Sequence, residues 1–582
     1  MKPGDEKIPD PKEIEKEISE FLAKKFKDNV KIISPMVLPQ EAALDTADKS
    51  PKNKKKINFD LLPEDLIAHL DQYIVKQDLA KAILATKICT HFNRIQRGQT
   101  HPEDISEMVG SIKNNVLMLG PTGVGKTYII KLIANKIGVP FVKGDATKFS
   151  ETGYVGGDVE DLVRDLVREA DDDIELAQYG IIYIDEIDKI AGSRNLVGAD
   201  VSRTGVQRGL LKPMEETDID LKVPHDPISM IQEIERFRKT GKRDNRTVNT
   251  KNILFIMSGA FSDLPEIIRK RIHEMGIGFG APIKNPQDDI DILKHVKSED
   301  FIAYGFESEF VGRLPVRAVF EALSEADLLE ILINPNNPII LGKKLDFAAY
   351  GIDVKFDEAA LHSLAKIAFE ENTGARGLGS AVERALLIFE KKLPSVGIRK
   401  FPVTNEVINH PEETLENMVA APQSDELHKT FERLSRKEGE LIKEDLHSNS
   451  SWLANKYRLT MTPSRMDIVS LYYTDHIVDI GKAIQQIRSY YDEVKRIELY
   501  FFKNHDINIV LEEDAIDFII EKIATSEIHL DEFYNQLNLD FEHGLRLVRE
   551  KTGTSRFFIT REALLEPETF IRNMLSKELP QS

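Results

Sequence analysis

The stretch NVLMLGPTGVGKTYII, residues 115–130, decides the fold of this chain of 582 residues. Residues 115–119 are typical of a short buried strand, and residues 128–137 have the spacing of apolar residues that is typical of a helix. Between them, residues 120–127 match the pattern G-x-x-x-x-G-K-[ST], in the strand–turn–helix context that this pattern requires. The stretch therefore predicts a phosphate-binding loop.

The residue types of this loop suit a nucleoside triphosphate. Its glycines let backbone N–H groups approach the phosphates, and the N-terminus of the following helix adds a favourable dipole. Lys126 would neutralise the charge of the β- and γ-phosphates, and Thr127 would offer its hydroxyl to Mg²⁺. The ATP-binding residues predicted from this stretch are Pro121, Thr122, Gly123, Val124, Gly125, Lys126, Thr127 and Tyr128.

A second apolar run, IIYIDEID at residues 181–188, ends in two carboxylates. At the end of a strand, Asp185 would face the metal, and Glu186 would polarise a water for attack on the γ-phosphate. An acidic pair after a strand is common in proteins. Together with the phosphate-binding loop, however, it predicts an enzyme that hydrolyses a nucleoside triphosphate and uses Mg²⁺.

The remaining pattern predicts an α/β fold with several domains. Short apolar strands, including one at residues 253–257, alternate with helical segments, which is typical of a parallel sheet covered by helices on both faces. Around residues 324–393 the pattern becomes mostly helical, with one short strand near residues 352–356. We predict four parts: an N-terminal helix (12–28) and flexible linker within 1–56, a large ATPase domain at 57–322, a small helical α+β lid domain at 323–423, and a helical extension at 424–582.

The extension contains two segments that resemble segments of the small domain. FPVTNEVINHPEE from Phe401 aligns with FFITREALLEPET from Phe557. GIDVKFDEAALHSLAKIA from Gly351 aligns, with one gap, with DINIVLEEDAIDFIIEKIA from Asp506. Because the matches keep their order and nearly the same offset, we interpret the extension as a degenerate second copy of the small domain. Chance similarity between helical segments is the alternative.

Composition narrows the classes of function. The chain has 78 basic and 97 acidic residues and a net charge of −19, which disfavours a protein that mainly wraps nucleic acid. Its single cysteine, Cys89, excludes a disulfide framework and a cysteine-rich zinc site within one chain. The N-terminus has no apolar signal segment, and no run of 18 apolar residues occurs, so we expect a cytoplasmic protein without a membrane partner.

Tyr154 and Val155 lie between two glycines, in the segment GYVG. An exposed aromatic–aliphatic pair is unfavourable unless it contacts something apolar, and glycines permit a mobile or tight loop. On the inner surface of a ring, this pair would grip an extended polypeptide with little demand on its sequence. A turn whose tyrosine packs inward is the alternative.

Several motifs between residues 59 and 395 together resemble the AAA+ unfoldases of the ClpX/HslU family. DATKFSETGYVGGDVEDLVRDLV from Asp145 is similar to their first pore loop, and GADVSRTGVQRGLLKPME from Gly198 to the second. The further motifs are YIVKQ from Tyr73 at the adenine, NILFIMSGAF from Asn252 as the sensor-1 strand, EFVGRLPV from Glu309 as the arginine-finger segment, and NTGARGL from Asn372 as the sensor-2 motif.

The resemblance implies roles for further residues. It places Tyr73, Ile74 and Val75 at the adenine and Ser258 near the γ-phosphate. It makes Arg313 a finger that reaches the site of a neighbouring subunit, and Arg376 a sensor that couples nucleotide state to the angle between the domains. Because such a site is shared between subunits, the resemblance implies a ring, most simply a homo-hexamer, that unfolds protein substrates.

A short glycine-flanked loop, GIGFG at residues 276–280, resembles the loop by which ClpX docks on the ClpP peptidase. Ile277, Gly278 and Phe279 would then enter hydrophobic clefts of a partner ring. HslU-type proteins lack this loop. A loop folded onto its own domain is the alternative.

The chain also departs from the family. A single cysteine cannot build the N-terminal zinc domain of ClpX, the family glycine is replaced by Lys76, and the extension has no counterpart. The leading hypothesis is an ATP-dependent unfoldase and translocase that feeds a ClpP-like peptidase. A peptidase-independent remodelling chaperone is the first alternative. A nucleic-acid-dependent motor is the second, and the net charge opposes it.

Overall fold

A computed structural model describes residues 60–100, 113–149, 158–192, 201–221, 247–274, 291–422, 424–525 and 529–576. The chain divides into two compact units, 1–56 and 57–582, and all described residues belong to the second. The predicted N-terminal helix at 12–28 lies outside the described residues.

A five-stranded parallel sheet forms the centre of the large domain, with the strand order β2-β3-β6-β1-β7. The predicted strands at 115–119, 181–184 and 253–257 correspond to β1, β3 and β6. The sequence pattern did not indicate β2 and β7, because each carries a cationic side chain, Lys143 and Arg317, within a short apolar run. The strands are β1 (Val116–Leu119), β2 (Phe141–Asp145), β3 (Ile181–Asp185), β6 (Leu254–Gly259) and β7 (Val316–Val319).

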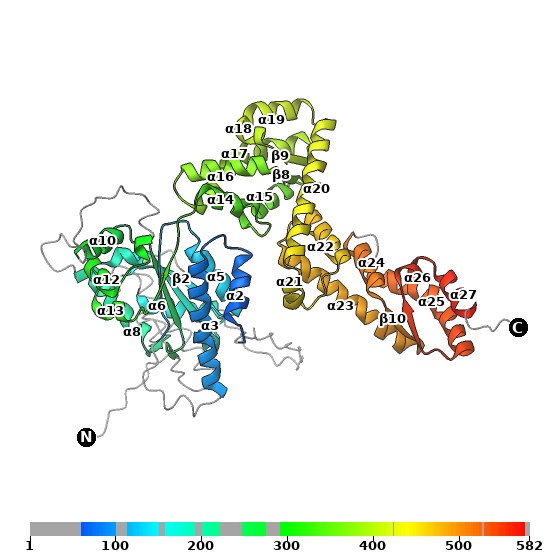
Figure 1. The fold of residues 1–582 in the computed structure, drawn as a ribbon, viewed down its shortest axis with the longest axis horizontal. Coiled ribbons are helices and arrows are strands. Elements are labelled where there is room, and N and C mark those ends of the chain that lie inside the picture. The colour runs from blue at the N-terminus through cyan, green and yellow to red at the C-terminus, as the bar shows by residue number, and fades with distance from the viewer. Residues whose placement is uncertain are drawn as a thin grey trace, which may run out of the picture. The chain divides into compact units, whose positions relative to one another are not determined.

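Helices cover both faces of this sheet (Figure 1). Val116 and Met118 of β1 face one apolar cluster, and Leu117 and Leu119 face the other. Alternation in a strand explains this division, and burial on both faces explains why the strand reads as one unbroken apolar run. The predicted α/β fold is confirmed. On one face lie α2 (Pro63–Asp71), α3 (Asp78–Thr100) and α5 (Lys126–Ile137); on the other lie α6 (Val159–Glu169), α7 (Ile174–Ala177), α8 (Val201–Met214), α10 (Leu264–Glu274), α12 (Ser298–Tyr304) and α13 (Ser308–Gly312).

The small domain has its own core around Phe347, Phe389 and Phe401. The predicted strand near 352–356 is β8, and it pairs in parallel with a second strand, β9, that the sequence pattern did not indicate. The elements are α14 (Glu325–Ile333), α15 (Pro338–Ala348), β8 (Asp353–Phe356), α16 (Glu358–Glu370), α17 (Ala375–Val396), β9 (Lys400–Val403), α18 (Asn405–Asn409) and α19 (Pro411–Ala420).

The extension is helical, as predicted, and contains a further parallel strand pair, β10 and β11. Its core is separate from that of the small domain. The elements are α20 (Asp425–Ser448), α21 (Ser450–Tyr457), α22 (Pro463–Asp475), α23 (Ile480–His505), β10 (Asn508–Leu511), α24 (Glu513–Ala524), α25 (Leu530–Thr552), β11 (Arg556–Ile559), α26 (Arg561–Leu565) and α27 (Pro567–Ser576).

The order of elements from β8 to α19 recurs from β10 to α27, with a parallel strand pair in both runs. This shared order supports our proposal that the extension is a degenerate copy of the small domain. The N-cap of α17 is Gly374 and that of α25 is His529. By this match of N-caps, Asp531 takes the position of Arg376, whereas the sequence alone had suggested Glu532, one residue later. The second copy still lacks the arginine.

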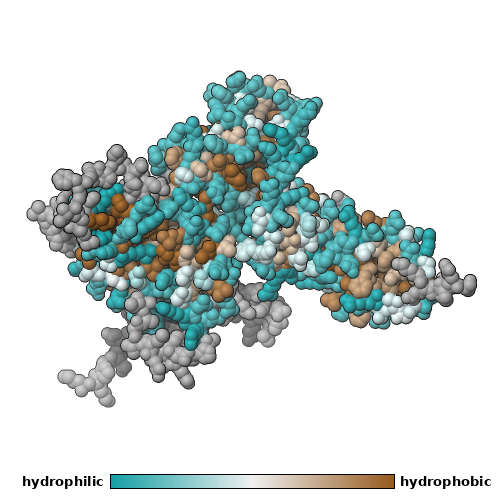
Figure 2. Space-filling model, viewed as in Figure 1, coloured by the Kyte–Doolittle hydropathy of each residue, from teal (hydrophilic) through white to brown (hydrophobic). Residues whose placement is uncertain are grey.

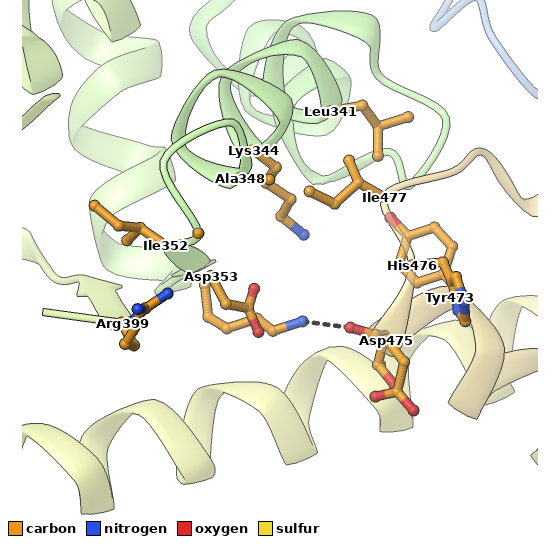
Figure 3. A pocket seen from close by; sticks show the side chains of 13 residues that line it. Leu341, Lys344, Ala348, Ile352, Asp353, Arg399, Tyr473, Asp475, His476 and Ile477 are labelled. Atoms are coloured by element: carbon orange, nitrogen blue, oxygen red, sulfur yellow. Dashed lines mark hydrogen bonds between the residues drawn. The ribbon is translucent and has the colours of Figure 1, made fainter. Parts of the chain in front are cut away.

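The extension joins the small domain along α20, which packs on β8 and β9. Glu438 of α20 forms ion pairs with two buried lysines, Lys344 and Lys355. Lys355 also donates to the carbonyl of Thr474, at 3.0 Å, beside a cavity of 260 Å³ between α15, β8 and the end of α22 (Figure 3). Breaking such a buried pair leaves an uncompensated charge, so this junction resists separation.

Hydrophilic residues cover most of the molecular face drawn in Figure 2, as expected when 30% of residues are charged. Among the described helices, none is long and apolar enough to cross a bilayer.

Candidate nucleotide-binding site

The phosphate-binding loop follows β1 and leads directly into α5, which begins at Lys126, two residues earlier than predicted. The N-cap is Gly125, in the left-handed region at φ 92°. A glycine suits this conformation, because other residues are strained there. The loop therefore lies at the carboxyl edge of the sheet, with the N–H groups of the first turn of α5 available to an anion.

The Lys126 ammonium is buried inside this loop. Its Nζ donates to the carbonyl oxygens of Gly120 at 2.6 Å and Pro121 at 2.7 Å. Burial lowers the pKa of Lys126 to about 8, although Asp185 and Asp188 favour its charged form. Phosphate oxygens next to Lys126 would stabilise the ammonium further, so nucleotide binding and protonation of Lys126 favour each other.

A chain of hydroxyl groups joins three predicted site residues. Thr127 Oγ1 donates to the Tyr183 hydroxyl at 3.1 Å, which lies 2.6 Å from Ser258 Oγ. Ser258 Oγ in turn donates to Asp185 Oδ1 at 2.6 Å. Each hydroxyl has one proton, and Ser258 gives its own to Asp185. In the contact between Tyr183 and Ser258, Tyr183 is therefore the donor. The side chains of α5, β3 and β6 thus meet at one edge of the sheet.

Tyr183 was missed by the sequence reasoning. A signal was available, because a tyrosine within an apolar strand normally needs a partner for its hydroxyl. Burial raises the pKa of Tyr183 to about 12. The hydroxyl therefore stays protonated and able to donate at neutral pH.

Asp185 has a second partner that the sequence reasoning missed, the Lys143 ammonium, 3.1 Å from Oδ2. Burial alone would raise the pKa of Asp185, but the hydrogen bond from Ser258 and the Lys143 ammonium hold it below its usual range. Asp185 is therefore ionised at neutral pH. Lys143 lies on β2, a strand that the sequence pattern did not indicate.

Glu186, the predicted base, is exposed and has a left-handed backbone, at φ 57° and ψ 33°. Its backbone N–H donates to Asp185 Oδ1 at 3.1 Å. A non-glycine residue in this region is strained by about 1–3 kcal/mol, and such strain is concentrated at functional sites. The turn directs the chain away from β3 directly after the two carboxylates.

The predicted adenine segment lies against the loop. A Cβ added at Gly125 would lie 3.9 Å from Ile74 Cδ1. Val75 is also buried, and Tyr73 is partly buried. Burial raises the pKa of Tyr73 to about 12, helped by the negative charge of Asp479. Burial raises the pKa of Tyr128 as well, and the charge of Asp479 raises it further. Because Asp479 belongs to the extension, both predicted tyrosines lie near the extension.

The small domain contacts the phosphate-binding loop through the start of α17. The N–H of Ala375 donates to the carbonyl of Gly123 at 2.8 Å. A Cβ at Gly123 would lie only 2.1 Å from the carbonyl oxygen of Thr373, so this approach requires glycine. The next residue, Arg376, is exposed. Its positive charge lowers the pKa of Lys126, but by less than burial lowers it.

Arg313 lies elsewhere. Its carbonyl accepts from Asn115 Nδ2 at 3.2 Å, and residue 115 precedes β1 at the amino edge of the sheet, opposite the phosphate-binding loop. The guanidinium pairs with Glu215, directly after α8. The chain therefore does not bring Arg313 to its own loop. Tyr154, Val155, Ile277, Gly278 and Phe279 lie outside the described residues.

Two family models match the chain. One, described as an AAA domain (Cdc48 subfamily), covers residues 112–317. The other, described as the C-terminal, D2-small domain of ClpB protein, covers residues 340–388. The two matches fall on the large and small domains.

Curated relatives carry the name ATP-dependent Clp protease ATP-binding subunit ClpX. One from Treponema denticola is 38% identical over 348 residues, which is 59% of this chain and 80% of the relative. One from Borrelia duttonii is 38% identical over 365 residues, or 62% and 81%. The chain belongs to the ClpX family.

As a member of the ClpX family, the chain is an AAA+ ATPase and binds nucleotide. A third relative, ClpX 3 of Methylococcus capsulatus, is 37% identical over 335 residues, 56% of this chain and 74% of its own length. These matches leave more than a third of this chain outside the shared region. The two family models also end before the long helical extension, at residue 388.

Proposed function

We propose that the chain is an ATP-dependent protein unfoldase and translocase that works as a homo-hexameric ring and delivers substrates to a ClpP-like peptidase. The relatives' shared name supports this role. The observation that carries it is the division of the predicted site between two edges of one sheet. Lys126 and Asp185 lie at the carboxyl edge, and Arg376 follows Ala375, whose N–H contacts the phosphate-binding loop, whereas Arg313 lies at the amino edge.

The chain's own residues account for binding and hydrolysis. The loop N–H groups and Lys126 would hold the phosphates, and Glu186 would take a proton from the attacking water. Ionised Asp185 and the Thr127 hydroxyl are hard oxygen donors that fit Mg²⁺, which supplies positive charge to the phosphates when bound.

A neighbouring subunit would complete the site. Because Arg313 cannot reach the loop of its own chain, its role as a finger requires a second copy, whose Arg313 stabilises charge in the transition state. The ion pair with Glu215 keeps the guanidinium on the surface, half exposed. In a closed ring of head-to-tail contacts, every subunit has a neighbour whose Arg313 can reach its site, so every site is complete.

The hinge between the two domains would transmit the nucleotide state. Gln77 exchanges hydrogen bonds with the backbone of Glu321, both at 2.8 Å. Lys76 donates to the carbonyl of Ala322 and pairs with Asp327, both at 3.0 Å. Lys76, which replaces the family glycine, thus ties the adenine segment to the first helix of the small domain, despite its left-handed φ of 61°.

Movement of the small domain would drive the loop with Tyr154 and Val155 along a central pore and pull the polypeptide. The loop with Ile277, Gly278 and Phe279 would dock the ring on the peptidase. The extension favours the first alternative, a peptidase-independent remodelling chaperone, because it adds a domain beyond the two family models that the chain matches.

One experiment separates these functions. A folded fluorescent reporter with an unstructured tail is incubated with the protein and ATP, with and without a ClpP-type peptidase. The proposal predicts ATP-dependent loss of fluorescence in both samples and degradation only with the peptidase. Loss of fluorescence without degradation in either sample would favour the remodelling chaperone. An unchanged reporter, with ATPase activity stimulated by DNA, would favour the nucleic-acid motor.

A further inference from the structure

The extension forms a hydrogen bond with the large domain at Gln72, directly before the adenine segment. Lys456 Nζ of α21 donates to Gln72 Oε1 at 3.1 Å. The same ammonium lies 4.4 Å from the ring centroid of Trp452, so the ring holds it in place as a cation–π partner. Residues 72 and 456 are 384 positions apart, and this contact joins two domains.

The backbone of Gln72 is held from the other side by the small domain. Its carbonyl accepts from Asn334 Nδ2 at 3.0 Å and from Asn336 Nδ2 at 3.3 Å. Both asparagines belong to the loop between α14 and α15. Gln72 therefore contacts the small domain through its backbone and the extension through its side chain.

The extension also holds this loop. The N–H of Ile480, the first residue of α23, donates to Asn336 Oδ1 at 3.0 Å. The hydroxyl of Tyr473 donates to the carbonyl of Pro335, also at 3.0 Å. Together with the Glu438 ion pairs, these contacts fix the extension to the small domain on one side and to Gln72 on the other.

This junction is partly buried, because Gln72, His69 and Lys456 are each partly shielded from solvent. Burial lowers the pKa of Lys456 to about 8, and the positive charge of Lys136 on α5 adds to that effect. Burial also lowers the pKa of His69, in the last turn of α2, to about 3. A hydrogen bond from an ammonium is stronger where water does not compete for it.

We propose that the extension positions the adenine segment, Tyr73 to Val75, through the contact of Lys456 with Gln72, and so raises the affinity of the site for ATP. Lys456 is a positioning residue, because it acts through Gln72. Loss of its hydrogen bond would let the start of the adenine segment move, while the phosphate-binding loop keeps its own support from β1 and α5. This inference rests on the proposed assignment of Tyr73, Ile74 and Val75 to the adenine.

The test compares Lys456→Met with the wild type, in the full-length protein. Methionine keeps the length and apolar stem of the side chain but removes the ammonium. Dissociation constants of ATP and of inorganic triphosphate, which lacks the base, are measured by competition with a fluorescent ADP analogue. We expect ATP to bind about 5–10-fold more weakly, the scale of one ordinary hydrogen bond, and inorganic triphosphate to bind as in the wild type.

Two further variants and a thermal unfolding scan distinguish positioning from a general loss of structure. Lys456→Arg keeps the charge and donor, so it should retain most of the ATP affinity. Lys503→Met replaces an exposed lysine at the far end of α23 and should change neither constant. The proposal is wrong if Lys456→Met binds ATP within twofold of the wild type, or if both ligands weaken equally.

A double-mutant cycle tests the path through Gln72. Asn336→Ala removes the bond to the Gln72 carbonyl and the acceptor for Ile480. If Lys456 and Asn336 act on the same residue, the double variant should lose less ATP affinity than the sum of the single losses. Independent, additive losses would contradict the shared path. Because these measurements need no protein substrate, they can succeed even where unfolding of a reporter fails.

Discussion

At the scale of single residues, the site depends on how burial and hydrogen bonds set the charge of each group. Asp185 keeps its charge because Ser258 and Lys143 offset the effect of burial on its pKa. Glu186, the next residue, is exposed, and its backbone is left-handed. Two adjacent carboxylates thus have different environments, which is the usual basis for different roles in one reaction.

The first prediction concerns Glu186. Replacing it by glutamine keeps the size of the side chain but removes its ability to accept a proton. We expect ATP binding within twofold of the wild type and a kcat for ATP hydrolysis at least 100-fold lower, the scale of general base catalysis. Steady-state ATPase assays and nucleotide binding measure the two effects.

Glu175→Gln is the matched control for this variant, because Glu175 is an exposed glutamate on α7, before the other end of β3. It should leave kcat unchanged. A normal turnover rate in Glu186→Gln would reject Glu186 as the base.

At the scale of secondary-structure elements, contacts between distant segments build the site. The start of α17 touches the phosphate-binding loop, and α21 touches the end of α2. His69, at the end of α2, faces three groups: Lys456 of α21, Lys136 of α5 and the ring of Tyr73, 5.2 Å away. This junction excludes the charged form of His69.

The second prediction is a pH dependence that arises from His69. Its pKa is about 3 in the folded protein and 6.5 in a model peptide. Between these values the unfolded chain binds a proton that the folded chain does not, so His69 destabilises the fold as pH falls below 6.5. One such proton lowers the free energy of unfolding by at most about 1.4 kcal/mol for each pH unit.

The variant His69→Phe keeps a ring beside Tyr73 and removes the titration. Thermal unfolding between pH 7 and pH 4.5 should show a smaller loss of stability for this variant than for the wild type. Parallel losses in the two proteins would show that His69 does not titrate in this way.

The elements that the sequence predicted are those whose signals are local. The loop at 120–127, the carboxylates after β3 and the strands β1 and β6 each have a contiguous pattern. β2 and β7 were missed because Lys143 and Arg317 interrupt short apolar runs. Tyr183, Lys143 and Lys456 were missed as site residues because their roles depend on contacts with distant segments, which no local pattern specifies.

At the scale of the whole molecule, the proposed function is that of a motor whose sites are shared between subunits. The third prediction concerns Tyr154. Tyr154→Ala should keep ATP hydrolysis within about threefold of the wild type but lose unfolding of a tagged, folded reporter, because the substrate is no longer gripped. Loss of reporter fluorescence measures unfolding, and phosphate release measures hydrolysis. Unfolding at the normal rate would exclude Tyr154 from contact with the substrate.

The fourth prediction concerns Arg313. Arg313→Ala should bind ATP as the wild type does and hydrolyse it at least 100-fold more slowly, since a finger of this kind contributes large factors to the rate. Its monomer should keep its thermal stability, because the guanidinium is half exposed and its pair with Glu215 lies at the surface.

The most direct measurement mixes two inactive proteins, Glu186→Gln and Arg313→Ala, at equal concentration under conditions where subunits exchange. If one subunit supplies Glu186 and its neighbour supplies Arg313, some interfaces in the mixture contain both intact residues. The mixture should then hydrolyse ATP clearly faster than either variant alone. A mixture no faster than the mean of the two variants would contradict a site shared between neighbours.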